Sequence, residues 1–424
     1  MIVATRVWRS FLMLILLIFG ISSSSIVAMV WDNRYFPWFD QLYKASDNTH
    51  GYLDVNAFFI VDRDAFRFEH RADKKDQVVS LPGLWGKLDL TNVGKSLVAV
   101  GKPNPIPQDW QWLSDFDAAT PSSMDGQGVA FACYAPIGKH FGVGANNFVM
   151  KLSSFVQVVP GDNAISKLNL ETSGNQVLFT QMMHDMYQEL GIVSTSYQEV
   201  GVGDTIVFAC IHDTQEYKYK FRKIDWGSYF GIIIPTATKQ NPYNLASIPF
   251  GGGDGMWGWF VAPFAEIELK DDWIIGCQLR LTQRIDRCIN MRIPVGDEQT
   301  LFAPIVGSVN INSGITVSFA PYLVFQDLRA GFGMQAKYLI TVHEHDYFTA
   351  RLNNGLAAHF SDTNYYSGWT QEYLSIRLFY DVAHDKNWQK RPLCYLTWDI
   401  PMNHIAGRGF AKTNRVSIGC NVNF

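Results

Sequence analysis

Charged side chains of both signs alternate with apolar ones along several segments, and their types and spacing could select a solute. Arg280, Arg284, Asp286 and Arg292 share one parity of the stretch 273–293. Alternate residues of a β-strand point to the same face, so this pattern predicts one charged face. Opposed acidic and basic walls select small hydrophilic solutes by size and charge. The residues predicted to line such a passage are Arg280, Arg284, Asp286, Arg292, Lys337, Arg377, Arg415, Glu266, Glu268, Asp381 and Asp399. The alternative is that these charges pair with one another and fill a closed interior.

Two motifs have residue types that bind cofactors or metals elsewhere. "GGGDGMWGW" contains G-x-G-x-x-G from Gly253 to Gly258, but a Trp-rich strand follows where a nucleotide-binding loop needs a helix. His343 and His345 lie on one strand face in "VHEHD" and could hold a metal only with a third ligand from a neighbouring strand. We therefore expect no cofactor and no metal.

A third motif has the residue types of a hydrolase triad. His359, Ser361 and Asp362 stand together in "HFSD". Triad groups usually converge from separate elements, and neighbours in sequence cannot readily adopt that geometry. The motif is typical of a solvated loop, and we expect that the chain is not an enzyme.

Composition excludes some classes of protein. The chain has 424 residues, of which 14% are aromatic and 17% charged, with a formal net charge of −4. This balance argues against nucleic acid as a partner. The mean hydropathy is −0.02, so the apolar residues are interleaved with polar ones and not massed in long runs.

The exception is the N-terminus, where "FLMLILLIFGI" follows Arg6 and Arg9 and precedes small residues up to Ala28. This is the pattern of a secretory signal peptide at 1–28. The apolar run is shorter than the roughly 20 residues that a spanning helix needs. We expect an exported protein with a periplasmic N-terminal segment at 29–50.

From Gly51 onward the apolar residues recur with period two, which is the signature of strands. The predicted strands are 51–62, 127–137, 140–156, 204–217, 220–236, 256–269, 273–293, 314–326, 331–350, 369–383, 391–400 and 413–424. Short polar connections alternate with long ones, of which 63–126 and 157–203 are the longest. This rhythm predicts an all-β fold at 51–424, a closed antiparallel transmembrane β-barrel of about 12 strands.

Two details support a barrel over a soluble β-sandwich, whose strands show the same alternation. The stretch 273–293 is far longer than an ordinary strand. Aromatic residues also cluster near the ends of predicted strands, as the interfacial girdles of a barrel require. The aromatic residues predicted to form these girdles are Trp226, Trp257, Trp259, Trp273, Trp369, Trp388 and Tyr52.

Two long connections contain helical patterns, "DLTNVGKSLVAVG" and "LETSGNQVLFTQMMHDMYQELG", the second ending at Gly191. Long loops with their own helices are often functional. We hypothesise that one or both of these small helices fold into the mouth or the lumen of the barrel and narrow it.

The chain ends in "RVSIGCNVNF", with apolar residues at alternate positions down to a final aromatic. This ending, after a signal peptide, resembles the C-terminal signature of bacterial outer-membrane β-barrel proteins. The resemblance implies that Phe424, Val422 and Cys420 belong to an assembly signal that the barrel-assembly machinery recognises. It also implies a location in the cell outer membrane, with membrane lipid as a partner, and it permits a homo-oligomer.

The predicted function is a porin-like channel for passive diffusion of small hydrophilic solutes. The alternative is a specific barrel transporter for hydrophobic or aromatic compounds, because Phe260, Phe264 and Tyr322 have inward parity. An outer-membrane hydrolase or a structural barrel is a third possibility. The six cysteines permit disulfides, although Cys277, Cys394 and Cys420 have the outward parity of packing residues.

Overall fold

The computed structural model describes residues 34–37, 51–67, 78–170, 172–217, 222–250, 254–270, 273–352, 355–384 and 391–423. The predicted signal peptide at 1–28 and the terminal Phe424 lie outside these ranges.

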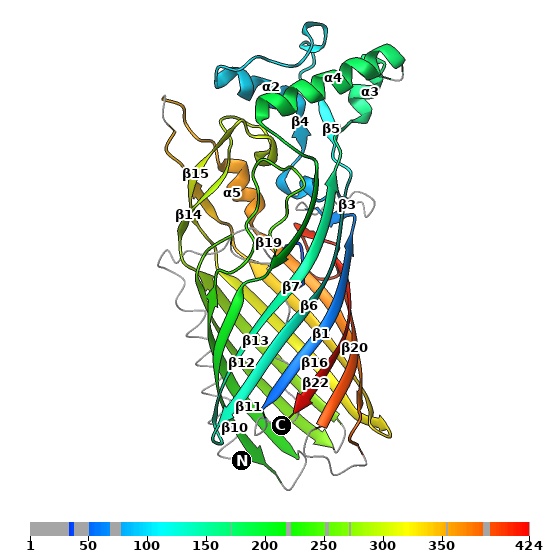
Figure 1. Cartoon of the computed structure of the whole chain (residues 1–424), viewed down its shortest axis with the longest axis vertical. Coiled ribbons are helices and arrows are strands. Elements are labelled where there is room, and N and C mark those ends of the chain that lie inside the picture. Colours follow the sequence, from blue (N-terminus) through cyan, green and yellow to red (C-terminus); the bar gives the residue numbers. More distant parts are fainter. Residues whose placement is uncertain are drawn as a thin grey trace.

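Antiparallel strands form one closed sheet, so the predicted fold class is confirmed (Figure 1). The first strand closes the ring by pairing with the last one, Tyr52 opposite Asn423. Each strand pairs with its neighbours along the chain. The strands of the barrel wall are β1 (Tyr52–Asp62), β6 (Ser122–Ile137), β7 (Phe141–Val156), β10 (Thr205–Glu216), β11 (Lys223–Ile234), β12 (Gly258–Lys270), β13 (Trp273–Arg284), β16 (Thr316–Arg329), β17 (Phe332–His343), β19 (Trp369–Asp381), β20 (Arg391–Pro401) and β22 (Asn414–Asn423). A further strand, β9 (Ser196–Val202), continues the line of β10 and pairs with the far half of β7.

Two predicted segments each contain two strands instead of one. The stretch 273–293 divides into β13 and β14 (Arg287–Ile293), and 331–350 divides into β17 and β18 (Tyr347–Thr349). In the wall, β13 pairs with β16 as far as Thr282 and with β12 as far as Arg284. Beyond that point, β14 pairs with β15 (Ile305–Asn312), which also pairs with β18. A chain that leaves the sheet must find new partners for its backbone groups, and the period-two pattern continues through that change.

The connections are sorted between the two ends of the barrel. One end, here called the turn end, carries the short links between β6 and β7, β16 and β17, and the other hairpins, together with the start of β1 and the close of β22 (Figure 1). The opposite end, here called the loop end, carries the long connections. Short turns on one side and long loops on the other are typical of transmembrane barrels.

The long connections pack together above the barrel around their own apolar core. Their remaining elements are β2 (Ala65–Phe66), β3 (Val78–Val79), η2 (Pro82–Trp85), β4 (Leu88–Asp89), α2 (Leu90–Ala99), η3 (Gln108–Trp110), β5 (Asp117–Ala119), β8 (Val159–Pro160), α3 (Asp162–Leu168), α4 (Ser173–Leu190), η4 (Thr300–Phe302), α5 (Ser361–Ser367) and β21 (Phe410–Ala411). No helix in the described part of the chain is both long and apolar enough to cross a membrane.

The two predicted helices are present as α2 and α4, and α4 stops at Gly191, whose φ is +66°. Figure 1 shows both at the far top of the loop end, well above the barrel wall. Inward-facing side chains of α4, such as Met182 and Met186, are buried in the apolar core of the loops. The hypothesis that these helices enter the mouth of the barrel therefore does not match the structure.

Candidate functional site

The outer face of the barrel is apolar and exposed, while the inner face is polar and buried. On β1, Val55 and Phe59 are 38% and 56% exposed, whereas Asp54 and Asn56 are 6% and 9% exposed. A soluble β-sandwich buries its apolar face, so this arrangement requires a lipid environment around the wall. The protein is an outer-membrane β-barrel.

The predicted aromatic girdle of this outer-membrane barrel is correct only in part. Trp226, Trp257 and Trp273 are about half exposed, as interfacial residues are. Trp369 and Tyr52 instead lie inside, 2% and 8% exposed. Trp388 is outside the described residues.

Aromatic rings line one wall of the interior. The ring centroids of Tyr134 and Phe208 are 6.5 Å apart, those of Phe208 and Tyr229 are 5.6 Å apart, and those of Tyr229 and Phe264 are 5.1 Å apart. These distances are typical of favourable aromatic pairs. The buried apolar cluster of this wall comprises Tyr52, Ala132, Tyr134, Ile206, Phe208, Cys210, Tyr229, Ile233, Phe260, Ala262 and Phe264. We call it the aromatic wall.

The arginines predicted to steer solutes are instead engaged with buried partners. Arg284 forms a 2.6 Å ion pair with Asp204, which lies between β9 and β10, and both side chains are at most 3% exposed. Arg280 lies 4.0 Å over the ring of Phe260 in the aromatic wall, which is a cation–π contact.

A second buried pair lies across the barrel, where Arg415 on β22 donates to Asp399 on β20 at 2.7 Å. Each of these arginines faces the interior as predicted, but the charges of Arg284 and Arg415 are compensated by Asp204 and Asp399. The alternative in which charges pair and fill a closed interior therefore describes this part of the barrel.

The half of the interior nearer the turn end holds another buried apolar cluster, formed by Ile274, Val324, Phe379 and Tyr395. Lys337 and Arg377 are partly exposed, and Arg377 donates to Thr397 at 3.0 Å. Glu266 is buried and accepts a 2.5 Å hydrogen bond from Tyr322.

The remaining predicted acids lie at the turn end of their strands. Glu268 is 3.4 Å from Arg222. Asp381 caps the backbone N–H of Ala383 at 2.9 Å. Both therefore lie at the turn end of the wall and not in the middle of the barrel.

Asp286 and Arg292 do not line the barrel, which corrects their predicted position on a single long strand. Asp286 is exposed between β13 and β14, and Arg292 lies on β14 in the loop region. Arg292 donates to the carbonyl of Pro242 at 2.7 Å, and also to those of Leu190 and Ala303. Burial lowers its pKa to about 10.

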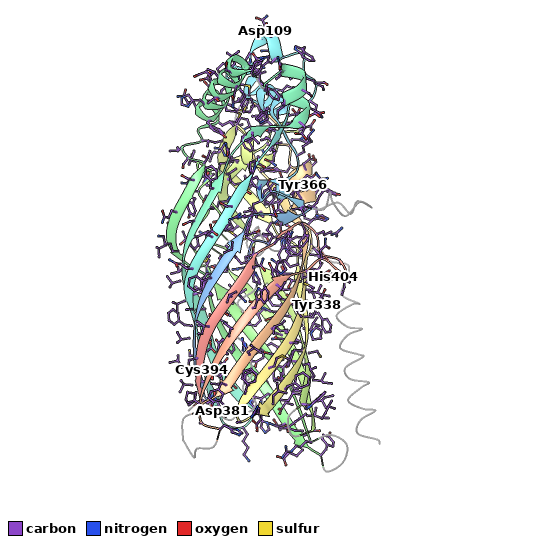
Figure 2. The ribbon with its side chains drawn as sticks, turned by 90° about the vertical axis from the view of Figure 1, so that its right-hand side faces the viewer. Asp109, Tyr338, Tyr366, Asp381, Cys394 and His404 are labelled. Atoms are coloured by element: carbon purple, nitrogen blue, oxygen red, sulfur yellow. The ribbon has the colours of Figure 1, made fainter. Side chains whose placement is uncertain are left out.

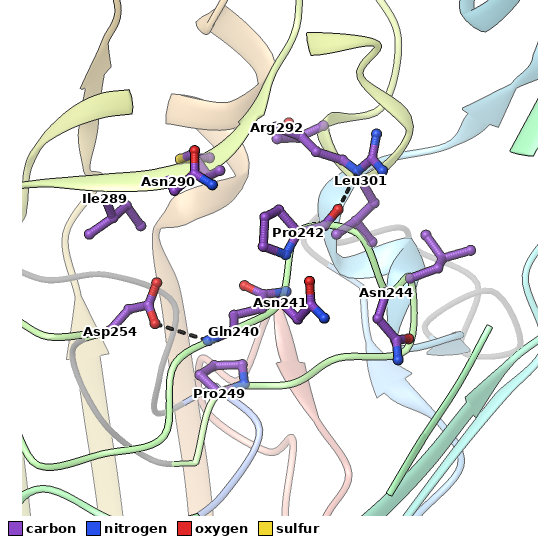
Figure 3. Close-up of a pocket in the computed structure, with 13 residues that line it drawn as sticks. Gln240, Asn241, Pro242, Asn244, Pro249, Asp254, Ile289, Asn290, Arg292 and Leu301 are labelled. Atoms are coloured by element: carbon purple, nitrogen blue, oxygen red, sulfur yellow. Dashed lines mark hydrogen bonds between the residues drawn. The ribbon is translucent and has the colours of Figure 1, made fainter. Parts of the chain in front are cut away.

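Figure 3 shows Arg292 beside Pro242 at the edge of a small pocket among the loops. The pocket is also lined by Asp254, whose Oδ1 accepts from the backbone N–H of Gln240 at 3.0 Å. Burial raises the pKa of Asp254. The cavity has a volume of about 30 Å³, which is room for roughly one water. Arg292 therefore joins three connections instead of lining a passage.

The described residues of the N-terminal segment occupy the interior near the loop end. Arg34, Tyr35 and Phe36 are at most 5% exposed. Two inward-facing side chains of the wall hold this segment: Gln371 donates to the Phe36 carbonyl at 3.2 Å, and Arg415 donates to the Pro37 carbonyl at 3.2 Å. Residues 34–37 of the predicted periplasmic segment 29–50 therefore lie inside the barrel, and the rest of that segment lies outside the described residues.

Arg34 fastens the segment to the loop region. It donates to the backbone carbonyls of Tyr366 and Ser367 at 2.7 and 2.8 Å. Its guanidinium carbon lies 4.2 Å over the ring of Trp85. We call Arg34–Pro37 the inner segment, because it fills the barrel where the loops meet the wall.

One carboxylate, that of Glu372, occupies a strand position whose side chain should point outward to the lipid. Glu372 on β19 shares its parity with the apolar Leu374, yet it is fully buried. The loop after β20 folds back over it, and the backbone N–H groups of His404, Ile405 and Ala406 donate to its carboxylate. Tyr338 adds a 2.9 Å hydrogen bond. Figure 2 shows His404 and Tyr338 on the same side of the barrel exterior.

The two histidines of the motif lie in different surroundings. His343 is buried and faces Asp346 at 3.2 Å, whereas His345 is exposed and stacks on Tyr365. The described residues contain no group of three or more His, Cys, Asp or Glu that could hold a metal ion. Part of the glycine motif, 251–253, lies outside the described residues.

The residues of "HFSD" meet in an unpredicted way. Ser361 Oγ is 3.1 Å from His359 Nε2. His359 Nδ1 is 2.9 Å from the carbonyl of Gly296 and 3.4 Å from Asp297, so Asp362 has no part in the arrangement. The side chains of His359 and Asp297 are 47% and 77% exposed. Catalytic triads act in enclosed sites that exclude water, and this group is solvated.

The predicted assembly residues lie on the last strand. Val422 and Cys420 have outward parity on β22 and are partly buried. Phe424 lies outside the described residues. Recognition of this strand by the assembly machinery therefore stays a prediction.

No family model and no curated protein matches the chain. Among solved structures, a COG4313 outer membrane channel from Pseudomonas putida F1 is 10% identical, with a TM-score of 0.47 over 92% of this chain and 100% of the other. A Pseudomonas aeruginosa FadL homologue is 9% identical, with a TM-score of 0.34 over 89% and 90%. The toluene transporter TodX from Pseudomonas putida is 8% identical, with a TM-score of 0.30 over 94% and 96%.

Sequence reasoning missed the inner segment and Asp204. Asp204 follows "VGVG" in a link between two strands, and nothing in the pattern connects it to Arg284. "RYFP" is a short apolar run with one arginine, and its aromatic residues are the only signal that it could pack in an interior.

Proposed function

We propose that this barrel is an outer-membrane channel for small apolar or aromatic compounds. The observation that carries the proposal is the aromatic wall, a continuous apolar surface on the inside of β1, β6, β10, β11 and β12. A water-filled passage for hydrophilic solutes needs wetted polar walls. Here Arg280, Arg284 and Arg415 are at most 8% exposed and are engaged with partners.

This proposal takes the second of the alternatives drawn from the sequence, in place of the porin for hydrophilic solutes. We infer that the buried inner segment obstructs the interior near the loop end, so passage requires that segment or neighbouring side chains to move. Apolar solutes suit such a path, because they lose no hydration shell when they cross a dry constriction.

The test compares the uptake of a radiolabelled monoaromatic hydrocarbon with liposome swelling in small sugars. We expect faster hydrocarbon uptake by cells that produce the protein and no swelling above that of empty liposomes. On the aromatic wall, Phe208→Gln should lower the uptake severalfold, whereas Phe208→Leu keeps the wall apolar and should preserve it. Rapid swelling in sugars, or equal uptake by both variants, would overturn the proposal.

We also propose that the protein is not an enzyme and that it binds no cofactor. The exposure of the Ser361, His359 and Asp297 group supports this, since a surface serine lacks the preorganised donors that stabilise an oxyanion.

A further inference from the structure

Cys394 and Cys420 lie directly opposite each other on neighbouring strands of the barrel wall. The register of β20 and β22 pairs them residue to residue. Their Sγ atoms are 4.0 Å apart, and both thiols are free. Opposite residues of an antiparallel pair have Cα atoms about 4.5–5.5 Å apart, which is within the range that a disulfide spans.

We propose that Cys394 and Cys420 form a disulfide bond that fastens the last strand of the barrel to its neighbour. The two sulfurs, now 4.0 Å apart, have to approach to the bonding distance of about 2.05 Å, and rotation of the side chains about χ1 supplies that movement in the proposed bond.

The other cysteines on wall strands have no such partner in the described structure. Cys133 on β6 is paired with Leu53 and Ala145. Cys277 on β13 is paired with Ala265 and Pro321. Register alone therefore selects one pair among the thiols of the wall.

The environment suits the reaction. The bond would form on the outer face, near the turn end, which in an outer-membrane barrel meets the oxidising periplasm. Each thiol loses one proton and one electron, a sulfur–sulfur bond forms, and the disulfide of a periplasmic thiol oxidase is reduced to two thiols. The step therefore balances with an oxidant of that class.

The position of the Cys394–Cys420 pair means that a disulfide there would constrain the last strand of the barrel. Strand β22 closes the barrel between β20 and β1, and Cys420 lies within the segment predicted to carry the assembly signal. A slip of one residue would turn the outward Val416 and Ile418 into the interior. A covalent link between Cys394 and Cys420 excludes that slip, so we infer that it fixes the register of the closing strand.

The test counts free thiols with a maleimide-polyethylene glycol in the full-length protein, purified from outer membranes under denaturing conditions. The chain has six cysteines, so the wild type should take four labels without reductant, six less the two in the bond, and six after reduction. Cys394→Ser should take five labels in both conditions. The control Cys133→Ser should take three without reductant and five with it.

Peptide mass spectrometry of the wild type tests the same bond without any variant, and it should find the Cys394 peptide linked to the Cys420 peptide. The temperature at which the folded barrel unfolds in detergent should also fall on reduction of the wild type, but not of Cys394→Ser. Six labels on the unreduced wild type, a different linked pair, or loss of the bond in Cys133→Ser would each overturn the proposal.

Discussion

Removal of the Arg34 side chain should open the interior of the barrel. Arg34 makes two charge-assisted hydrogen bonds to the carbonyls of Tyr366 and Ser367, and such bonds contribute about 1.5–3 kcal/mol each. Its stacking on Trp85 adds about 2 kcal/mol when desolvated. The gross contribution is therefore about 5–8 kcal/mol. Water and neighbouring groups replace part of it in Arg34→Ala, which leaves a net loss of about 3 kcal/mol if roughly half of the whole contribution is regained.

Since about 1.4 kcal/mol corresponds to a factor of ten, the fraction of barrels with a released inner segment should rise about a hundredfold. A cysteine introduced at Ser417 reports this opening, because Ser417 is the next inward residue of β22 after Arg415, which holds the inner segment, and it is 7% exposed. In a background with every other cysteine replaced by serine, its rate of labelling by a small water-soluble thiosulfonate follows the open fraction. The labelling rate should rise by the same factor.

Two variants make this result specific to the inner segment. Arg34→Lys keeps the charge but lacks the forked donors of a guanidinium, so its labelling rate should be intermediate. Arg63→Ala removes an exposed arginine just beyond the end of β1 and should leave the rate unchanged. A rate for Arg34→Ala within about threefold of the wild type would refute the view that the inner segment closes the barrel, since the bonds above predict far more.

Four further outcomes follow from the site. Asp204→Ala should lower the free energy of unfolding, measured with urea in detergent, by about 3–5 kcal/mol because Arg284 stays buried; adding Arg284→Met should recover most of that loss. Glu372→Ala should cost about 1–3 kcal/mol and expose the loop after β20 to protease, which an unchanged digestion pattern would contradict. Burial raises the pKa of Asp346, so its contribution to stability is complete below the unfolded pKa and is lost as the pH rises through the folded one; Asp346→Asn should flatten the fall in unfolding temperature over that window. A fluorophosphonate probe, which labels serine hydrolases, should give only background labelling of both the wild type and Ser361→Ala. Labelling of the wild type that is lost in Ser361→Ala would indicate a hydrolase.

The sequence predicts the wall strands well because their pattern has one physical cause. A residue of the wall faces either lipid or the interior, so polarity alternates along every strand, as in β1 with Val55 outward and Asp54 inward. The same alternation continues into β14, although the apolar side chains of β14 pack in the core of the loops and do not face the bilayer. Period two reports that a strand is half buried but not what buries it, so the change from β13 to β14 was not predictable.

The parity of a charged residue was predictable, but its partner was not. Arg284 faces inward as its parity requires, yet its acid, Asp204, comes from a link far away along the chain. Whether an arginine steers a solute or is neutralised depends on such long-range contacts. For this reason the sequence could identify interior charges such as Arg415 without deciding between an open pore and a filled one.

The one outward carboxylate shows how far the alternation rule reaches. Glu372 breaks the apolar parity of β19, and a bare carboxylate facing lipid would be costly. The chain resolves this by folding its last long connection over the outer face, so that His404, Ile405 and Ala406 donate backbone N–H groups to it. A polar residue at a lipid-facing position thus marks where a loop covers the wall.

Inward glycines and aromatic rings together shape the interior. Gly144 on β7 lies beneath the ring of Phe208, and Gly231 on β11 lies beneath the ring of Phe260, so that a Cβ atom at either glycine would collide with the ring. The missing side chains let both rings lie flat against the wall and not across the bore. The guanidinium of Arg280 lies 4.0 Å over the ring of Phe260, so at this point the wall presents an arginine to the axis and not a bare ring. In the proposed channel, a solute that moves along the aromatic wall would therefore meet Arg280 as well as the inner segment Arg34–Pro37.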